Sequence, residues 1–228
     1  MPGVLVIPTL YMVQFGSPEE FDRTFAIELA KQGYATLVPV LNQYGMIGPN
    51  IYDLRHADDV PLIAKWLRER PEVMDDRTGA VGFSLGGYYS AVLAANDPTV
   101  RAIVGYYGVY DLENRNLVFS RRIEAQWPGS PLRNAGKVSG AVLLLHGDAD
   151  NEVVAAQSLA YRDGLAAAGK TVEAVIYPRA HHRFDRGRSS LMQSDTSANG
   201  YIYRVDTQAR NDAWQRTLAL LEKHLKAN

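Results

Sequence analysis

The sequence predicts an α/β fold in which a mainly parallel sheet of about six strands carries helices on both faces. Short apolar runs recur along the chain, and each run is too continuous for a strand with one face in water. Segments with the apolar spacing of helices lie between these runs, so strand and helix alternate over nearly the whole chain. Right-handed crossovers are therefore expected, with ligands binding beyond the carboxyl ends of the strands.

The predicted strands are rich in β-branched and other apolar residues, as strands buried on both faces are. They cover Gly3–Pro8, Ala35–Val40, Gly79–Phe83, Ala102–Tyr107, Ala141–His146 and Val172–Tyr177.

The predicted helices follow from capping residues and from apolar spacing. The first begins at Ser17, where a capping serine precedes a proline and a glutamate, and ends at Gly33. A further helix runs from about Val154 to Ala168. The apolar stripes are Phe21, Phe25 and Leu29 in the first helix, Val60, Ile63, Ala64 and Leu67 in the second, and Trp214, Leu218, Leu221 and Leu225 in the last.

Composition excludes several classes of protein. The 228 residues suit one domain, residues 1–228, and 24 Lys and Arg against 25 Asp and Glu give no excess charge to attract nucleic acid or an anionic membrane. The absence of cysteine rules out disulfides, a thiolate nucleophile and a cysteine-based zinc site. No basic leader precedes Val4, and no apolar run approaches the roughly 20 residues that cross a bilayer, so a cytoplasmic protein is expected. The serine chemistry considered below implies no metal or cofactor.

Ser84 is the candidate nucleophile. It lies in Gly82-Phe83-Ser84-Leu85-Gly86-Gly87, between an apolar run and a segment with helical character, which is the sequence form of a nucleophile elbow. The turn from strand to helix is tight enough to require small residues at positions 82 and 86. The start of the following helix directs backbone N–H groups toward an oxyanion formed beside the serine. The alternative is a glycine-rich turn with an incidental serine.

A serine hydroxyl needs an imidazole to remove its proton and a carboxylate to orient that imidazole. Candidate bases are His181 and His182, which follow the strand ending at Tyr177. For the acid, Asp150 competes with Asp148 in the same loop and with Asp111 after the preceding strand. The residues alone leave these choices open, and a histidine pair on a polar loop is otherwise most often solvated.

Together these motifs resemble the α/β-hydrolase superfamily, and within it the dienelactone hydrolase family, with some likeness to prolyl-oligopeptidase-type hydrolases. The resemblance covers almost the whole chain. It rests on the elbow around Ser84, on Tyr106-Tyr107-Gly108, on His146-Gly147-Asp148-Ala149-Asp150, on the segment from Tyr177 to Asp185, and on Ala213-Trp214-Gln215-Arg216-Thr217.

The resemblance implies site residues. Asp150 matches the acid of the family's His-Gly-x-x-Asp pattern, and His182 matches the base of its Ala-x-His-x-Phe pattern. The oxyanion donors would be the backbone N–H of Leu85 and a second N–H near Leu10 or Tyr11. Candidate substrate-binding residues are Arg186, at the place of a family arginine that binds a substrate carboxylate, together with Trp127 and Tyr107.

The chain also departs from the family pattern. Dienelactone hydrolases typically have cysteine at the elbow and a glutamate near the oxyanion loop, and neither has a counterpart here. Arg179 and Arg183 stand where the family often has glycine. The usual amino-terminal hairpin is missing, which would leave a sheet edge or apolar surface uncovered and favour a homodimer.

The predicted function is hydrolysis of a small-molecule carboxylic ester, short-chain or lactone-like, through an acyl-serine. Residues 111–138 are too few for a large lid domain, which favours an open site. Two alternatives remain: a peptidase or amidase of the prolyl-oligopeptidase-like branch, and a non-catalytic α/β-hydrolase that only binds a ligand.

Overall fold

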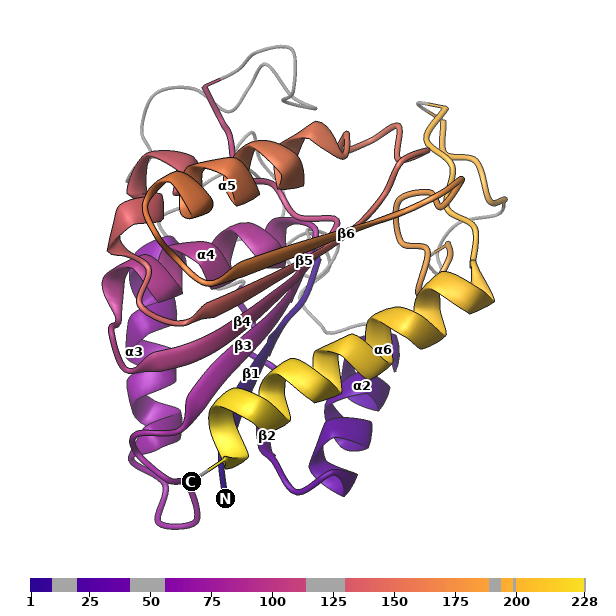
Figure 1. Cartoon of the computed structure of the whole chain (residues 1–228). Helices are drawn as coiled ribbons and strands as arrows, with labels where there is room; N and C mark the ends of the chain where they lie inside the picture. The colour runs from indigo at the N-terminus through magenta and orange to yellow at the C-terminus, as the bar shows by residue number, and fades with distance from the viewer. Residues whose placement is uncertain (10–19, 42–55, 114–129, 189–193, 199, 228) are drawn as a thin grey trace.

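The computed structural model describes residues 1–9, 20–41, 56–113, 130–188, 194–198 and 200–227. Within them six strands form one sheet in the order β2-β1-β3-β4-β5-β6, and every neighbouring pair is parallel (Figure 1). The strands are β1 (Gly3–Ile7), β2 (Ala35–Leu37), β3 (Thr78–Phe83), β4 (Val100–Tyr106), β5 (Ala141–Gly147) and β6 (Val172–Tyr177).

The strand order changes direction next to β1. The chain goes from β1 outward to β2, then returns to place β3 on the other side of β1 and continues to β6. In such sheets the crevice at the carboxyl ends of the strands, where the order reverses, is the usual ligand site. Ser84 directly follows β3 and therefore lies at this position.

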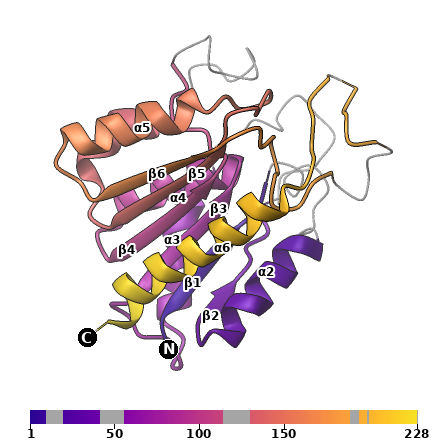
Figure 2. The same ribbon diagram turned by 45° about the vertical axis from the view of Figure 1, so that its right-hand side comes forward.

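Helices cover both faces of the sheet (Figures 1 and 2). One face carries α2 (Glu20–Lys31) and α6 (Thr207–Leu221), which continues as a π-helical turn η2 (Glu222–Lys226). The other face carries α3 (His56–Arg68), α4 (Leu85–Asn96) and α5 (Ala156–Ala167), together with the short 3-10 helix η1 (Pro131–Lys137).

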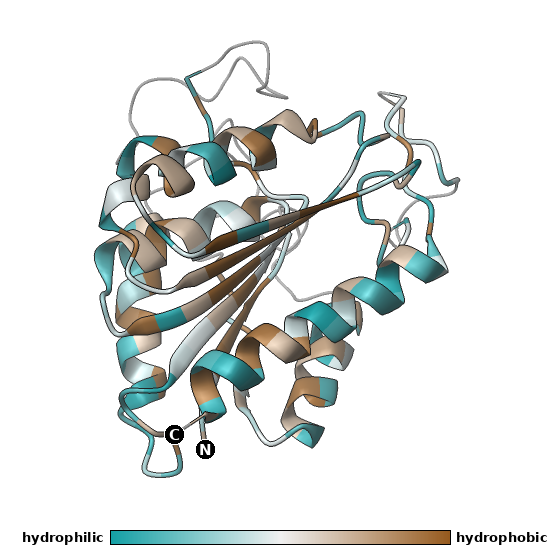
Figure 3. Cartoon of the chain, viewed as in Figure 1, coloured by the Kyte–Doolittle hydropathy of each residue, from teal (hydrophilic) through white to brown (hydrophobic). Residues whose placement is uncertain are grey.

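Each face of the sheet has its own hydrophobic core. The strands are the most hydrophobic part of the ribbon, and hydrophilic residues gather on the helices (Figure 3). Helix α4 is the exception among the helices because its residues from Leu85 to Ala94 are all buried. It packs against the sheet, α3 and η1 at once. The helix that follows Ser84 is therefore held from several sides.

The structure confirms the predicted fold class and places a strand at each of the six predicted positions, although β2 ends at Leu37 and not at Val40. Burial differs from expectation in two places. The outer strands β2 and β6 are partly exposed, because each is at an edge of the sheet. In α6 the deepest residues are Ala209, Ala213, Thr217 and Leu221, while Trp214 and Leu218 are only partly buried.

The first helix is described from Glu20, so the predicted start at Ser17 lies outside the described residues. Between β4 and β5 the chain is too short for a separate lid domain. None of the described helices combines the length and the apolar character needed to cross a membrane.

Candidate active site

Ser84 occupies the tight turn between β3 and α4. Its backbone has φ 53° and ψ −114°, a conformation that residues with side chains rarely adopt. Two backbone hydrogen bonds hold the turn: Ser84 N–H donates to Tyr106 O, and Gly87 N–H donates to Ser84 O, both at 2.9 Å. The hydroxyl is thereby presented at the carboxyl end of the sheet, and the residue is partly exposed.

The neighbouring glycines permit this turn. A Cβ atom at Gly82 would overlap the carbonyl oxygen of Gly86 and the hydroxyl of Ser90. A Cβ atom at Gly86 would overlap the carbonyl oxygens of Ile7 and Pro8. The chain leaving β1 therefore passes directly against the start of α4.

His182 and Asp150 come from the loops after β6 and β5. His182 Nε2 lies 3.2 Å from Ser84 Oγ, and His182 Nδ1 lies 2.6 Å from Asp150 Oδ2. Because Nδ1 faces a carboxylate, it carries the proton, which leaves Nε2 free to accept from the serine hydroxyl. Ser84, His182 and Asp150 thus form one hydrogen-bonded line from three distant parts of the chain.

Asp150 is held by several further donors. Its Oδ1 accepts the backbone N–H groups of Glu152 at 3.0 Å and Val153 at 2.9 Å. Its Oδ2 also lies 3.2 Å from Nε2 of His146, a fully buried histidine at the end of β5. The acid therefore has little freedom to rotate away from His182.

Asp150 and His182 each stabilise the charged form of the other. Burial alone would raise the pKa of Asp150, but the charge of His182 and the hydrogen bonds from His146 and His182 hold the pKa of this carboxyl well below its usual value. Burial alone would lower the pKa of His182, yet the carboxylates of Asp150 and Glu152 more than offset it, so this pKa is raised. Asp150 stays ionised, and His182 is made more basic.

Backbone strain is concentrated around these residues. The non-glycine residues with positive φ in the described part of the chain are Ser84, Tyr107, Arg179 and Arg183. Each of them follows the carboxyl end of a strand. Positive φ at Arg179 and Arg183 is a backbone conformation that favours glycine. Such strain is typical of active sites.

Tyr107 does not line the substrate side as expected. It is fully buried, its hydroxyl donates to Asp185 Oδ1 at 2.7 Å, and its ring meets the imidazole of His182 edge-on at 4.6 Å between centroids. It supports the histidine instead.

Arg186 is not placed to bind a substrate carboxylate, contrary to expectation. Its Nη1 is 2.6 Å from Asp22 Oδ1 on α2, and both side chains are almost fully buried. The guanidinium also lies over the rings of Phe21 and Phe83, at 4.0 and 3.9 Å from their centroids. A guanidinium enclosed in this way is not available to a substrate carboxylate, which corrects the expectation from the family.

The alternative acids and bases lie elsewhere. Asp148 accepts the N–H of Arg179, Asp111 accepts the N–H of Glu113, and His181 Nδ1 contacts Ala149 O at 3.0 Å. Leu85 is the first residue of α4, and the first N–H groups of a helix have no partner within it. The predicted second oxyanion donor, Leu10 or Tyr11, and the candidate Trp127 lie outside the described residues.

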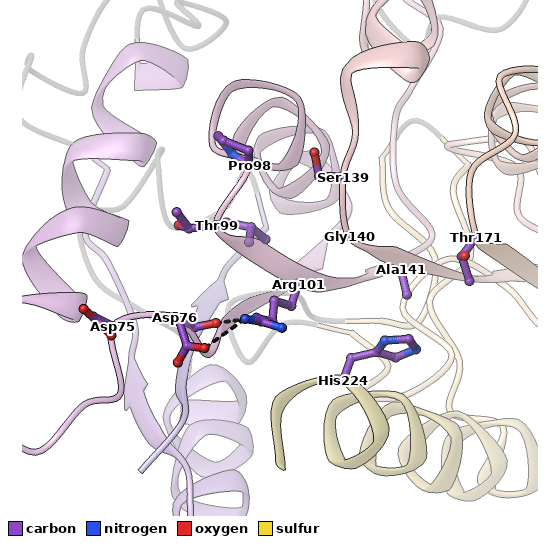
Figure 4. Close-up of a pocket in the computed structure, with 11 residues that line it drawn as sticks. Asp75, Asp76, Pro98, Thr99, Arg101, Ser139, Gly140, Ala141, Thr171 and His224 are labelled. Atoms are coloured by element: carbon purple, nitrogen blue, oxygen red, sulfur yellow. Dashed lines mark hydrogen bonds and ion pairs between the residues drawn. The ribbon is translucent and has the colours of Figure 1, made fainter. Parts of the chain in front are cut away.

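A cavity of about 670 Å³ lies at the opposite end of the sheet, near the amino ends of β4 and β5 (Figure 4). Its charged lining includes Arg101, which pairs with Asp76 at 2.9 Å, and both side chains are more than half exposed. We assign the site to the carboxyl ends because the strained turn and the buried His182 and Asp150 are there. Among the described residues no cluster of metal-binding side chains occurs.

Sequence reasoning missed two residues of the site, His146 and Glu152. His146 precedes Asp150 by four residues in the quoted His-Gly-x-x-Asp pattern, a spacing that offered a signal. Glu152 Oε2 lies 3.6 Å from His182 Nε2, and nothing in the local sequence indicated that it would.

Fold and site together are those of an α/β-hydrolase. The family model "Dienelactone hydrolase family" matches residues 1–225. The chain belongs to the dienelactone hydrolase family and is a hydrolase of the carboxylic ester class.

Relatives and solved structures agree with this placement. The chain is 27% identical over 237 residues to a Bradyrhizobium protein named "Probable 2-oxo-3-(5-oxofuran-2-ylidene)propanoate lactonase", covering 99% of this chain and 85% of that protein. A crystal structure of "Putative Dienelactone Hydrolase" from Klebsiella pneumoniae is similar with a TM-score of 0.74 and 26% identity, covering 98% of this chain and 88% of that one.

Proposed function

We propose that this protein hydrolyses short-chain or lactone-like carboxylic esters through an acyl-serine intermediate on Ser84. The observation that carries the proposal is the line of contacts from Ser84 Oγ through His182 to Asp150, with distances of 3.2 and 2.6 Å. These are the distances that proton transfer to a general base requires. The family membership and the lactonase name of one relative support the same chemistry.

The first half of the reaction is acyl transfer to the serine. His182 Nε2 takes the proton of Ser84 as Oγ bonds to the ester carbonyl carbon. That carbon becomes tetrahedral, and the carbonyl oxygen becomes an oxyanion. We assign the Leu85 N–H as one donor to that oxyanion, with the second from Leu10 or Tyr11. When the intermediate collapses, the carbon–oxygen bond to the alcohol breaks, and His182 gives its proton to the departing oxygen.

The second half repeats these steps with water. His182 removes a proton from water as the water oxygen attacks the acyl carbon, and the bond to Ser84 Oγ then breaks with return of the proton to the serine. Asp150 keeps the imidazole in the required tautomer and offsets its positive charge in both halves.

The test is hydrolysis of p-nitrophenyl acetate by the wild type and by the Ser84→Ala variant. Loss of one member of such a triad lowers kcat by about 10⁴-fold or more. The matched control is Ser139→Ala, because Ser139 is an exposed serine at the far end of the sheet (Figure 4). Equal activity in both variants would refute the serine mechanism. Cleavage of the p-nitroanilide as fast as the ester would favour the amidase alternative.

A further inference from the structure

Glu152 is a carboxylate next to the reacting nitrogen of His182. Its Oε2 lies 3.6 Å from Nε2, the same nitrogen that faces Ser84 Oγ. Its side chain is 19% exposed while that of His182 is 2% exposed, so Glu152 is the more accessible of the two to solvent. Its backbone N–H donates to Asp150, which fixes its position relative to the acid.

The alcohol part of an ester bound at Ser84 would come near this carboxylate. The leaving oxygen receives its proton from Nε2 and must therefore come within about 3.2 Å of that nitrogen. The carboxylate of Glu152 then lies no more than about 7 Å from the leaving oxygen. A charge carried two or three bonds further along the alcohol comes within a distance at which two charges interact strongly in a partly buried site.

The partners described for the nearby arginines are groups other than Glu152. Arg183 is 1% exposed, and its Nε donates to Gly187 O at 2.7 Å. Arg186 is enclosed with Asp22. Among the described residues the ion-pair contacts of His182 are with two carboxylates, Asp150 and Glu152. Arg183 also acts on His182 through its positive charge, but the charged groups described within ion-pair distance of the imidazole are carboxylates.

We infer that Glu152 sets the charge preference for the alcohol part of the substrate, so that esters of cationic amino alcohols are hydrolysed in preference to neutral isosteres, and anionic alcohols are disfavoured. The inference rests on the proposed ester hydrolysis and names the substrate class of the same site. The carboxylate attracts an ammonium group and repels a carboxylate on the departing alcohol.

The experiment compares three thioesters that differ in the charge of the leaving thiol. They are acetylthiocholine, its neutral isostere 3,3-dimethylbutyl thioacetate, and S-(2-carboxyethyl) thioacetate as the anion. Released thiol is measured with a disulfide reagent, and the absence of cysteine from the chain removes any background from the enzyme. Each substrate is tested with the wild type, with Glu152→Gln, and with Glu69→Gln, which removes one charge from an exposed site beyond α3.

The wild type is expected to favour the cationic over the neutral thioester by about tenfold or more in kcat/KM, less so at high salt. Glu152→Gln should bring that ratio close to one and should improve hydrolysis of the anionic substrate, while Glu69→Gln should keep the wild-type ratio. Because the comparison is a ratio between variants, contributions from the rest of the pocket cancel.

The experiment distinguishes failure of the role of Glu152 from failure of the proposed ester hydrolysis. If the wild type hydrolyses the neutral thioester and Glu152→Gln leaves the cationic-to-neutral ratio unchanged, the role of Glu152 is overturned while ester hydrolysis stands. If the wild type hydrolyses none of the three thioesters and no p-nitrophenyl acetate, the proposed function is overturned and this inference with it.

Discussion

His146 and Asp150 lie four residues apart in the chain, and Nε2 of the histidine is 3.2 Å from Oδ2 of the aspartate. That oxygen is also the one that contacts His182, at 2.6 Å. Nε2 of His146 is also 2.7 Å from Val153 O, and its Nδ1 is 2.7 Å from Ser158 Oγ. Facing two acceptors, Nε2 carries a proton, so His146 donates to the acid and orients it.

The His146→Phe variant is therefore expected to lower kcat/KM by about tenfold and to cost about 1–3 kcal/mol of folding free energy, because Asp150 loses a buried donor. Ester hydrolysis and urea denaturation measure the two effects. His146→Gln can restore a donor and should recover part of the activity. Full activity in His146→Phe would show that Asp150 is oriented without this histidine.

The pH dependence of kcat/KM should report the titration of His182. Only the neutral imidazole accepts the serine proton, so activity falls as the pH drops through the pKa of His182. The pKa is raised by Asp150 and Glu152 against the effect of burial, so the acidic midpoint should lie above the ordinary histidine value of about 6.5.

Glu152→Gln should move that acidic midpoint to lower pH, because a charge that favours the imidazolium is removed. Glu69→Gln serves as the control for a general change in charge. A midpoint that stays in place, or that rises in Glu152→Gln, contradicts the electrostatic account of His182.

Gly82→Ala tests the close packing of the elbow. The added Cβ would overlap the Gly86 carbonyl and the Ser90 hydroxyl, so the turn must shift. We expect a stability loss of about 2–3 kcal/mol and nearly complete loss of activity. Gly136→Ala is the matched control, since its Cβ would meet no atom closer than 4.0 Å. Equal behaviour of the two variants in urea denaturation and turnover would rule out the packing argument.

Asp22→Asn tests the buried pair between α2 and the loop after β6. Asp22 is the nearer of two carboxylates that pair with Arg186, the other being Asp185 at 3.3 Å, and breaking such a buried pair costs about 3–5 kcal/mol. Glu28→Gln breaks an exposed pair with Lys31 and should cost less than about 1 kcal/mol. Similar small losses in both variants, measured by urea denaturation, would mean that Arg186 does not depend on Asp22.

Much of the fold could be predicted because buried parallel strands appear in the sequence as continuous apolar runs, as β4 and β5 do. The buried face of α6 was harder to predict from the sequence. Small residues such as Ala213 lie deepest there, while the larger Trp214 packs at the margin, and apolar spacing alone does not separate the two.

The site residues were likewise predictable only in part. The elbow and the strand-exit loops indicated Ser84 and the region of Asp150 and His182. The burial of Arg186 in an ion pair could not be predicted, because its partner Asp22 is 164 residues away in the chain. The oxyanion donor at Leu10 or Tyr11, the cytoplasmic location and the homodimer stay predictions.

The most direct test of the central claim is reaction of the protein with a fluorophosphonate, followed by mass spectrometry of the digested protein. Such reagents phosphonylate a serine that a neighbouring base activates. The account predicts one adduct, on the peptide that contains Ser84, formed at a rate that falls by orders of magnitude in His182→Ala. Ester hydrolysis by a wild type that forms no adduct, or that forms it on another serine, would contradict the account.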